Sequence, residues 1–189
     1  YYLPRLAHGE ETACFALTAP NAGSDATAIS DKGIVCEQDF EGQKTLGILL
    51  NFDKRYITLA PVATLIGLAF KLYDPDHLIG EKTSRGITLA LVPSHLPGVS
   101  QGARHDPLSQ AFLNGPVRGQ DVFIPLEYII GGVPNVGKGW RMLMECLSVG
   151  RSISLPALSM AAANVSYRMS SAYAVLRQQF RRSIGEFEG

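Results

Sequence analysis

The period of the hydrophobic pattern changes once along this chain, near Val136, and that change constrains the fold more than any other feature. From residue 11 to about residue 130, short apolar runs such as "TACFAL" and "KTLGILLNF" are separated by Pro and Gly at nearly every junction. Runs of this length and punctuation predict short strands in a closed or sandwich-like β domain. The residues "EGQ" between two of these runs predict a hairpin.

After Val136 the pattern acquires the period of a helix. The apolar residues from Pro156 onward recur at steps of three or four, at Ala157, Ala161, Val165, Met169, Ala172, Leu176 and Phe180. This stripe predicts long helices, and Pro156 is acceptable near a helix start. We therefore predict an α+β chain, with a β-barrel or sandwich-like domain over residues 1–135 and the first long helices of an α-helical bundle domain over residues 136–189. Such helices need partners to bury the stripe. The chain also starts without Met and stops within a helix–turn pattern, so we expect a piece of a longer protein.

Composition excludes several classes of protein. Seventeen Lys and Arg balance seventeen Asp and Glu, so we expect no nucleic-acid partner. The three cysteines and four histidines lack metal-ligand spacing, which predicts no metal site and a reducing, cytoplasmic location. No stretch reaches the roughly 18 to 20 uninterrupted apolar residues of a membrane span. The part from Lys138 onward holds seven basic and three acidic residues, which indicates either a basic helix facing a phosphate or a solvated helix face.

The stretch "FALTAPNAGSDA" has the composition of a ligand-binding strand end. Phe15 and Leu17 alternate with a small residue, so one face of the strand is apolar. Thr18 offers a hydroxyl and a backbone N–H, Gly23 permits close approach or a positive φ, and Ser24 adds a donor. Together they can line the edge of a planar heterocycle and then meet a phosphate. The alternative is an ordinary Asx or Ser turn that closes a strand.

A second stretch, "KRYITLA", has a related composition. Tyr56 and Thr58 are two residues apart, so on a strand they share one face. An aromatic ring beside a hydroxyl suits the flank of a flat ligand. Tyr and Thr are also common strand residues, so the pair by itself leaves a plain strand as an alternative.

Taken together, these stretches resemble the middle domain of flavin-dependent acyl-CoA dehydrogenases. The resemblance continues through "NGPVRGQDVFIPLEYIIGG", "GKGWRMLMECLSVGR" and "YAVLRQQFRRSIG" in the family's order, so that it covers essentially the whole chain. It is greatest to the large bacterial branch that acts in fatty-acid β-oxidation, in which "LTAPNAGSDA", "RYITLAP" and "CLSVGRSISLP" take nearly this form. Four motifs in one order are far more specific than any one of them.

The resemblance implies flavin-binding roles in both strands. Phe15, Leu17 and Thr18 match the strand that presents backbone and hydroxyl groups to the FAD ring. Tyr56 stands where the family usually has a Trp beside that ring, and Thr58 matches the family's hydrogen-bonding Thr.

The resemblance also implies contacts to phosphate and substrate. Gly23 and Ser24 match the bend near the FAD pyrophosphate and the bound CoA thioester. Arg151 matches an arginine that borders the substrate channel. Arg181, on what we expect to be a basic C-terminal helix, matches an arginine that reaches FAD phosphates across a subunit interface.

Four positions depart from the family pattern. Ala19 replaces a common Glu, Tyr56 replaces Trp, Ser148 replaces a frequent Asp, and Ile184 replaces Phe in the arginine motif. The Ser148 departure weakens the expected account of the CoA contacts.

The family's reaction follows from this resemblance. A carboxylate removes the α-proton of a fatty acyl-CoA while a β-hydride passes to flavin N5, which leaves trans-2-enoyl-CoA, and the electrons depart through an electron-transfer flavoprotein. The family's base is a Glu that would lie beyond Gly189, so we assign no catalytic residue to this chain and expect the chain itself to be inactive. The full-length protein is expected to be a homo-oligomer. Two alternatives stay open, an acyl-CoA oxidase-like flavoprotein and a non-catalytic module that uses the flavin fold for binding.

Overall fold

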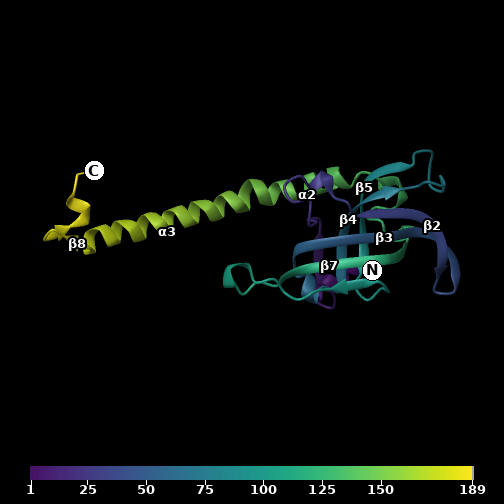
Figure 1. Ribbon diagram of the computed structural model, residues 1–189, viewed down its shortest axis with the longest axis horizontal. Coiled ribbons are helices and arrows are strands. Elements are labelled where there is room, and N and C mark those ends of the chain that lie inside the picture. Colours follow the sequence, from purple (N-terminus) through teal and green to yellow (C-terminus); the bar gives the residue numbers. More distant parts are fainter. Residues whose placement is uncertain (189) are drawn as a thin grey trace. The chain divides into compact units, whose positions relative to one another are not determined.

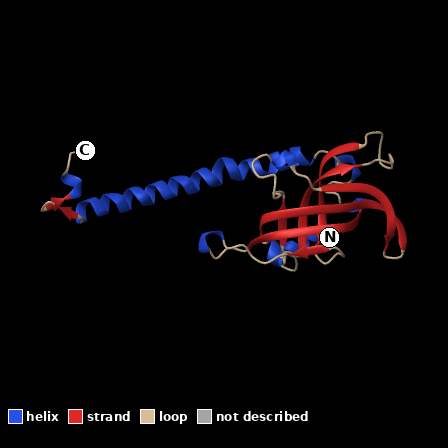
Figure 2. Cartoon of the chain, viewed as in Figure 1, coloured by secondary structure: helices blue, strands red, loops and turns tan. Residues whose placement is uncertain are grey.

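The computed structural model describes residues 1–188, and the chain divides into two compact units, Tyr1–Arg141 and Met142–Gly189. The first unit contains one short helix, α1 (Tyr2–Ala7), and seven strands that form one sheet (Figures 1 and 2). The strands are β1 (Ala13–Ala16), β2 (Lys32–Phe40), β3 (Gln43–Thr58), β4 (Leu65–Tyr73), β5 (Ser84–Pro93), β6 (Val99–Gln101) and β7 (Asn114–Pro125). The sheet is a curled β half-barrel, which confirms the predicted β domain.

Strand β4 pairs with three other strands. Its one edge pairs in parallel with β1 along Leu65–Leu68 and then with β2 along Lys71–Tyr73, while its other edge pairs antiparallel with β5. Strand β3 joins β2 to β7 by antiparallel pairing, and β6 extends β7. Most residues of β4 are buried, as expected for a strand that is covered on both faces.

The predicted hairpin at "EGQ" is confirmed. Phe40 pairs with Gln43, which leaves Glu41 and Gly42 as a two-residue turn with φ values of 54° and 79°. Positive φ at both central positions is the type I′ geometry that follows the right-handed twist of the two strands. Glycine adopts it without a steric penalty, whereas glutamate does not.

Strand β3 carries an irregularity that matters for the site. Lys54 pairs with Val117 and Ile57 with Gly115, so that Arg55 and Tyr56 both stand opposite Pro116. Proline has no N–H to give to a strand ladder, and a β-bulge is the usual consequence. Tyr56 accordingly takes a φ of 59°.

The core of the sheet is apolar and continuous. Fully buried side chains come from β2, β3, β4, β5 and β7 and include Val35, Ile48, Leu50, Ile66, Leu68, Phe70, Leu72, Val92, Val117, Val122 and Ile124. The alternation of buried and half-buried residues along β3 assigns one face to this core and the other to the outside.

The second unit is mostly one helical run. Helix α2 (Gly139–Val149) begins in the first unit, continues through the π-helical segment η6 (Gly150–Ser154) and then into α3 (Leu155–Leu176). Pro156 is the second residue of α3, and its missing N–H and its ring require the helical hydrogen bonds of the preceding turn, in η6, to be rearranged. The predicted helix start near Pro156 is therefore a change of helical type within a continuous run.

The predicted stripe ends earlier than expected. Strands β8 (Gln178–Gln179) and β9 (Arg182–Ser183) form a small hairpin after α3, and its turn consists of Phe180 and Arg181 with φ values of 51° and 67°. The expectation that Phe180 continues the stripe and that Arg181 lies on a basic helix is wrong. The reason is local: backbone with positive φ at two successive residues cannot belong to a right-handed helix.

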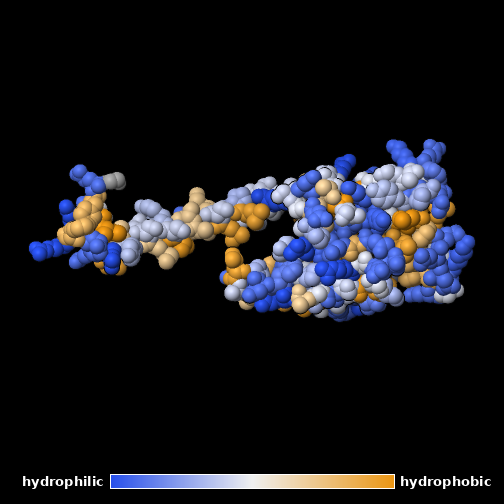
Figure 3. All heavy atoms as spheres, viewed as in Figure 1, coloured by the Kyte–Doolittle hydropathy of each residue, from blue (hydrophilic) through white to orange (hydrophobic). Residues whose placement is uncertain are grey.

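The apolar side chains of α3 are exposed within this unit. They include Leu158, Val165, Tyr167, Met169, Val175 and Leu176, and Figure 3 shows apolar residues mixed with more polar ones along the helix. The helical run Gly139–Leu176 is also long and apolar enough to cross a membrane, but the core helices of soluble proteins can have the same length and mean hydropathy. The predicted domain boundary at residues 135 and 136 stays a prediction.

Candidate functional site

Two hydrogen bonds bring the two stretches singled out in the sequence side by side. The backbone N–H of Arg55 donates to the carbonyl oxygen of Thr18 over 3.1 Å. The side-chain Nζ of Lys54 donates to the carbonyl oxygen of Leu17 over 2.9 Å. The end of β1 is thereby fixed against the last third of β3, although Thr18 and Lys54 are 36 positions apart in the chain.

The outer face beside this junction carries the predicted aromatic and hydroxyl groups. Tyr56 is 57% exposed and Phe15 is 39% exposed, whereas the residues that follow them, Ile57 and Ala16, face the core. Thr58 is exposed on the same side of β3 as Tyr56, because the two residues flank the buried Ile57. We call Phe15, Leu17, Thr18, Tyr56 and Thr58 the β1–β3 wall.

The Tyr56 ring has two neighbours that sequence reasoning missed. The guanidinium carbon of Arg55 lies 4.7 Å from the centre of the ring, and the His105 ring centre lies 4.9 Å away. His105 is itself fixed by a contact of 2.9 Å between its Nδ1 and the side-chain oxygen of Asn114. No local pattern links residue 105 to residue 56, so only the folded sheet reveals that His105 supports the tyrosine.

The bend that follows Thr18 is closed by backbone hydrogen bonds at Ala19 and Ala22, and the space beside Gly23 is open. Ala19 and Ala22 are buried and exchange two backbone hydrogen bonds of 3.2 Å. Gly23 does not have a positive φ, and a Cβ added to it would meet nothing within 4 Å. The prediction that Gly23 is needed for a positive φ is therefore wrong. The other predicted reason for a glycine, close approach of a ligand to the backbone, stays a prediction. Ser24 next to it is exposed.

Behind the wall lies a buried ion pair. The Nζ of Lys54 is 2.6 Å from Oδ2 of Asp31, and neither side chain is more than 1% exposed. The other carboxylate oxygen of Asp31 accepts the backbone N–H of Asp53 over 2.9 Å. Burial lowers the pKa of the Lys54 ammonium, and the attraction of Asp31 opposes that shift.

The two arginines predicted to contact substrate and phosphate belong to the second unit. Arg151 is exposed within η6, and Arg181 is exposed at the tip of the β8–β9 hairpin. The hairpin presents Arg181 on a tight turn rather than along a helix. Their roles stay predictions.

The arrangement of the first unit fits a flat, phosphate-bearing ligand such as FAD. The exposed Tyr56 ring, the exposed Thr58 and the half-buried Thr18 belong to one wall, and the bend next to it has open space at Gly23. No group of His, Cys, Asp or Glu within residues 1–188 is arranged to hold a metal ion.

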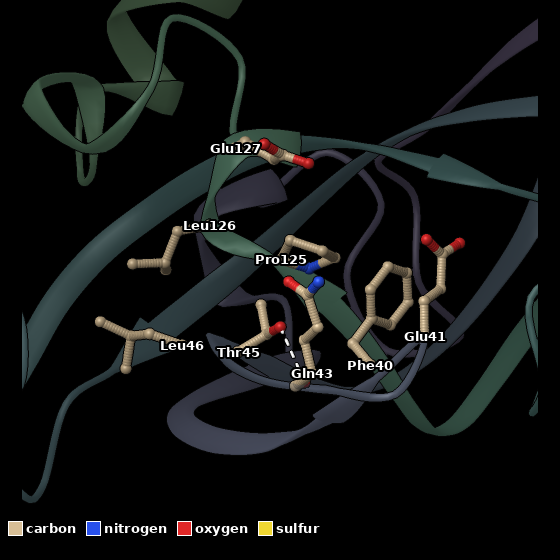
Figure 4. A pocket seen from close by; sticks show the side chains of 8 residues that line it. All are labelled: Phe40, Glu41, Gln43, Thr45, Leu46, Pro125, Leu126 and Glu127. Atoms are coloured by element: carbon tan, nitrogen blue, oxygen red, sulfur yellow. Dashed lines mark hydrogen bonds between the residues drawn. The ribbon is translucent and has the colours of Figure 1, made fainter.

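A separate pocket of about 390 Å³ lies between the β2–β3 hairpin and the end of β7 (Figure 4). It is lined by Phe40, Glu41, Gln43, Thr45, Leu46, Pro125, Leu126 and Glu127. Within this lining, the Thr45 hydroxyl donates to the Gln43 carbonyl oxygen over 3.0 Å. None of the residues predicted to bind cofactor or substrate lines this pocket. It is therefore no part of the β1–β3 wall.

Comparison with known families agrees with the class of domain that the half-barrel and its wall define. Residues 14–122 match the family described as acyl-CoA dehydrogenase, middle domain, and this range contains the whole β1–β3 wall. The chain therefore belongs to the acyl-CoA dehydrogenase family.

Curated relatives carry several names. The chain is 57% identical over 91 residues to Protein HemX of Proteus mirabilis, a match that covers 48% of this chain and 54% of that protein. It is 34% identical over 195 residues to 3-(aryl)acrylate reductase of Clostridium sporogenes and 32% identical over 197 residues to mitochondrial 2-methylacyl-CoA dehydrogenase of Solanum tuberosum. These two matches cover 99% of this chain but 45% and 41% of those proteins, so the chain spans about half the length of the curated relatives it matches.

Solved structures resemble the chain over nearly its full length. An acyl-CoA dehydrogenase from Geobacillus kaustophilus gives a TM-score of 0.74 at 28% identity, covering 98% of this chain and 45% of that one. An acyl-CoA dehydrogenase complexed with FAD from Bacillus anthracis gives 0.72 at 28% identity, covering 98% and 29%. An electron transferring flavoprotein of Acidaminococcus fermentans gives 0.70 at 26% identity, covering 98% and 44%.

Proposed function

We propose that this chain forms part of the FAD and acyl-CoA site of a dehydrogenase that oxidises fatty acyl-CoA to trans-2-enoyl-CoA in fatty-acid β-oxidation. The observation that carries the proposal is the β1–β3 wall, in which the bond from Arg55 to Thr18 places an exposed tyrosine beside the hydroxyl-bearing end of β1. Membership of the family and a relative complexed with FAD support it.

Each residue of the wall has a role in this proposal. Tyr56 packs against the flat face of the flavin, and the Arg55 and His105 contacts hold its ring in place. Thr18 and Thr58 supply hydrogen-bond donors to the heteroatoms at the ring edge. When bound, FAD accepts the hydride from the acyl chain, and the protein supplies placement.

Three further residues act on the charged and thioester parts of the ligands. The open space at Gly23 admits the pyrophosphate, and Ser24 next to it donates to phosphate or thioester oxygen. Arg151 contacts the substrate, and the guanidinium of Arg181 pairs with phosphate, for which its fork of donors is suited. The proposed partners are fatty acyl-CoA, an electron-transfer flavoprotein and further copies of the chain in a homo-oligomer, in the cytoplasm.

The direct test is FAD binding by matched tyrosine variants. Titration of FAD into the purified protein should quench flavin fluorescence and give the visible spectrum of a bound flavin. Tyr56→Ala should weaken FAD binding by about tenfold, since an aromatic contact of this kind contributes about 0.5–1.5 kcal/mol beyond the area it buries.

The control is Tyr167→Ala, which removes another exposed tyrosine, one that lies on α3. It should leave the affinity for FAD unchanged. Absence of FAD binding by the unchanged protein, or equal binding by both variants, contradicts the proposal. In the full-length protein, bleaching of the bound flavin by fatty acyl-CoA tests the proposed substrate.

A further inference from the structure

Lys54 is among the largest fully buried side chains of residues 1–188, although it carries a charge. Its ammonium has two partners, the Asp31 carboxylate at 2.6 Å and the carbonyl oxygen of Leu17 at 2.9 Å. The second partner belongs to the last peptide before Thr18, at the end of the β1–β3 wall.

Stability alone does not explain such a pair. Removing two charges from water costs several kcal/mol for each ion, and replacing a buried pair by apolar residues of similar volume is often neutral or stabilising. A buried lysine whose second bond is to a backbone carbonyl therefore indicates a role in fixing that peptide.

The pair is anchored on two strands. Asp31 accepts the backbone N–H of Asp53 on β3 through its side chain, and its carbonyl accepts the backbone N–H of Lys71 on β4 over 2.9 Å. Since Asp31 is held by β3 and β4 and Lys54 itself belongs to β3, the ammonium has little freedom to move. The hydrogen bond from Lys54 therefore ties the Leu17 carbonyl to strands β3 and β4.

The orientation of this carbonyl determines what the next residue presents. In a trans peptide the C=O and the following N–H point in opposite directions. The Leu17 carbonyl points inward to Lys54, so the N–H of Thr18 points outward. The Thr18 carbonyl is also held, by the N–H of Arg55.

We propose that Lys54 is a positioning residue, which with Asp31 fixes the Leu17–Thr18 peptide so that the Thr18 N–H donates to an acceptor atom at the edge of the flavin ring. The proposal rests on the proposed function, because it requires a flavin against the β1–β3 wall. It gives a role to Lys54, the one lysine among residues 1–188 that is buried, without requiring that its side chain touch the ligand.

The test is a paired neutral replacement, Asp31→Asn together with Lys54→Met. The amide introduced at position 31 keeps an oxygen that can accept the Asp53 N–H, and methionine has a similar length to the lysine stem, so no charge is left buried without its partner. The matched control is Glu37→Gln with Lys44→Met, which neutralises an exposed ion pair on the β2–β3 hairpin.

Two readouts distinguish positioning from a merely structural effect. In the protein without FAD, the NMR signals of the Leu17 carbonyl carbon and the Thr18 amide should shift in the paired variant, while those of β4 stay in place. The affinity for FAD should fall by up to about tenfold, since the loss of one hydrogen bond between neutral groups corresponds to a factor of this size. The control variant should change neither readout.

A measurement on the unchanged protein covers the case in which the paired variant fails to fold. The Thr18 amide should exchange with solvent quickly without FAD and slowly when FAD is bound. Unchanged exchange at Thr18, or full FAD affinity in a folded paired variant, overturns the role of Lys54 and leaves the proposed function standing. Absence of FAD binding by the unchanged protein overturns the proposed function itself, and the donor role with it.

Discussion

At the scale of single residues, the thiol of Cys14 makes stability depend on pH. Cys14 is 6% exposed on β1, and burial raises the pKa of its thiol from 9.0 to about 11. As pH rises, the unfolded chain therefore loses this proton before the folded chain does. The contribution of the buried thiol to the free energy of unfolding is fully present below pH 9 and is lost as pH rises through about 11. The loss should amount to about 2–3 kcal/mol of the free energy of unfolding.

Urea unfolding on either side of this pH window measures the effect. Cys14→Ala should show a smaller decrease in the free energy of unfolding across the window, because other groups that ionise there are common to both proteins. Parallel decreases in the two proteins would mean that the thiolate of Cys14 is solvated in the folded state.

The same substitution at two glycines of the first unit should destabilise the protein at one position and have almost no effect on stability at the other. A Cβ at Gly47 would overlap the Ile124 carbonyl and the Phe123 ring, so Gly47→Ala should lower the free energy of unfolding by about 1–3 kcal/mol. Gly23→Ala should change it by less than about 0.5 kcal/mol, since the space there is open and φ is ordinary.

The Gly23 variant also tests the site. If a phosphate approaches the backbone at Gly23, the added methyl group should weaken FAD binding by about fivefold or more while the stability stays the same. Chemical denaturation of the two variants measures the free energy of unfolding, and FAD titration measures the affinity for FAD. Unchanged FAD affinity in Gly23→Ala would place the pyrophosphate elsewhere.

Much of the site could be predicted residue by residue, and the rest could not. The shared face of Tyr56 and Thr58 follows from strand geometry, and the structure places both outside the buried Ile57. His105 and the pair of Lys54 with Asp31 were not predicted, because their contacts join residues that are 49 and 23 positions apart. A single sequence carries no signal for such pairings.

At the scale of elements, the β2–β3 turn is not optimised. Glu41 adopts a φ of 54° in a type I′ turn, a conformation that asparagine tolerates better than glutamate. Glu41→Asn should therefore raise the free energy of unfolding by up to about 1 kcal/mol. Urea denaturation measures this change.

Glu81→Asn serves as the control for that turn. Glu81 is an exposed loop residue without a positive φ, so the same substitution should leave the stability unchanged. Equal effects at both positions would show that the loss of a negative charge, and not the turn geometry, is responsible.

Strand periodicity predicted the elements better than their pairing. Hydrophobic runs indicated the strands and the hairpin, whereas the parallel pairing of β1 with β4 depends on a segment 52 residues further along. The end of α3 was also missed, since apolar spacing continued to Phe180 while the backbone turned into a hairpin. The pairing of β1 with β4 joins segments that no local window contains, whereas the end of α3 was missed because apolar spacing carries no information about backbone φ.

At the scale of the whole molecule, the two units should differ in local stability. The first unit has a continuous core, whereas nearly every side chain of α3 is exposed. Helices in water depend on packing for most of their stability. In the purified chain, amides of Leu155–Leu176 should therefore exchange with solvent much faster than those of Leu65–Tyr73.

Hydrogen exchange followed by mass spectrometry measures both segments in one experiment. Peptides from β4 should exchange only on global unfolding, and peptides from α3 should exchange by local opening. Equal protection of the two segments would mean that the apolar stripe of α3 is covered in solution.

The strand order has a consequence for synthesis on the ribosome. Strand β1 is translated first, but its neighbour β4 ends at Tyr73, and β3 has its second neighbour only when β7 is complete at Pro125. The nascent chain therefore carries Cys14–Ala16 as an unpaired apolar segment until β4 has been made. A cofactor present during translation finds no finished wall until β7 has emerged, so loading follows synthesis of the sheet.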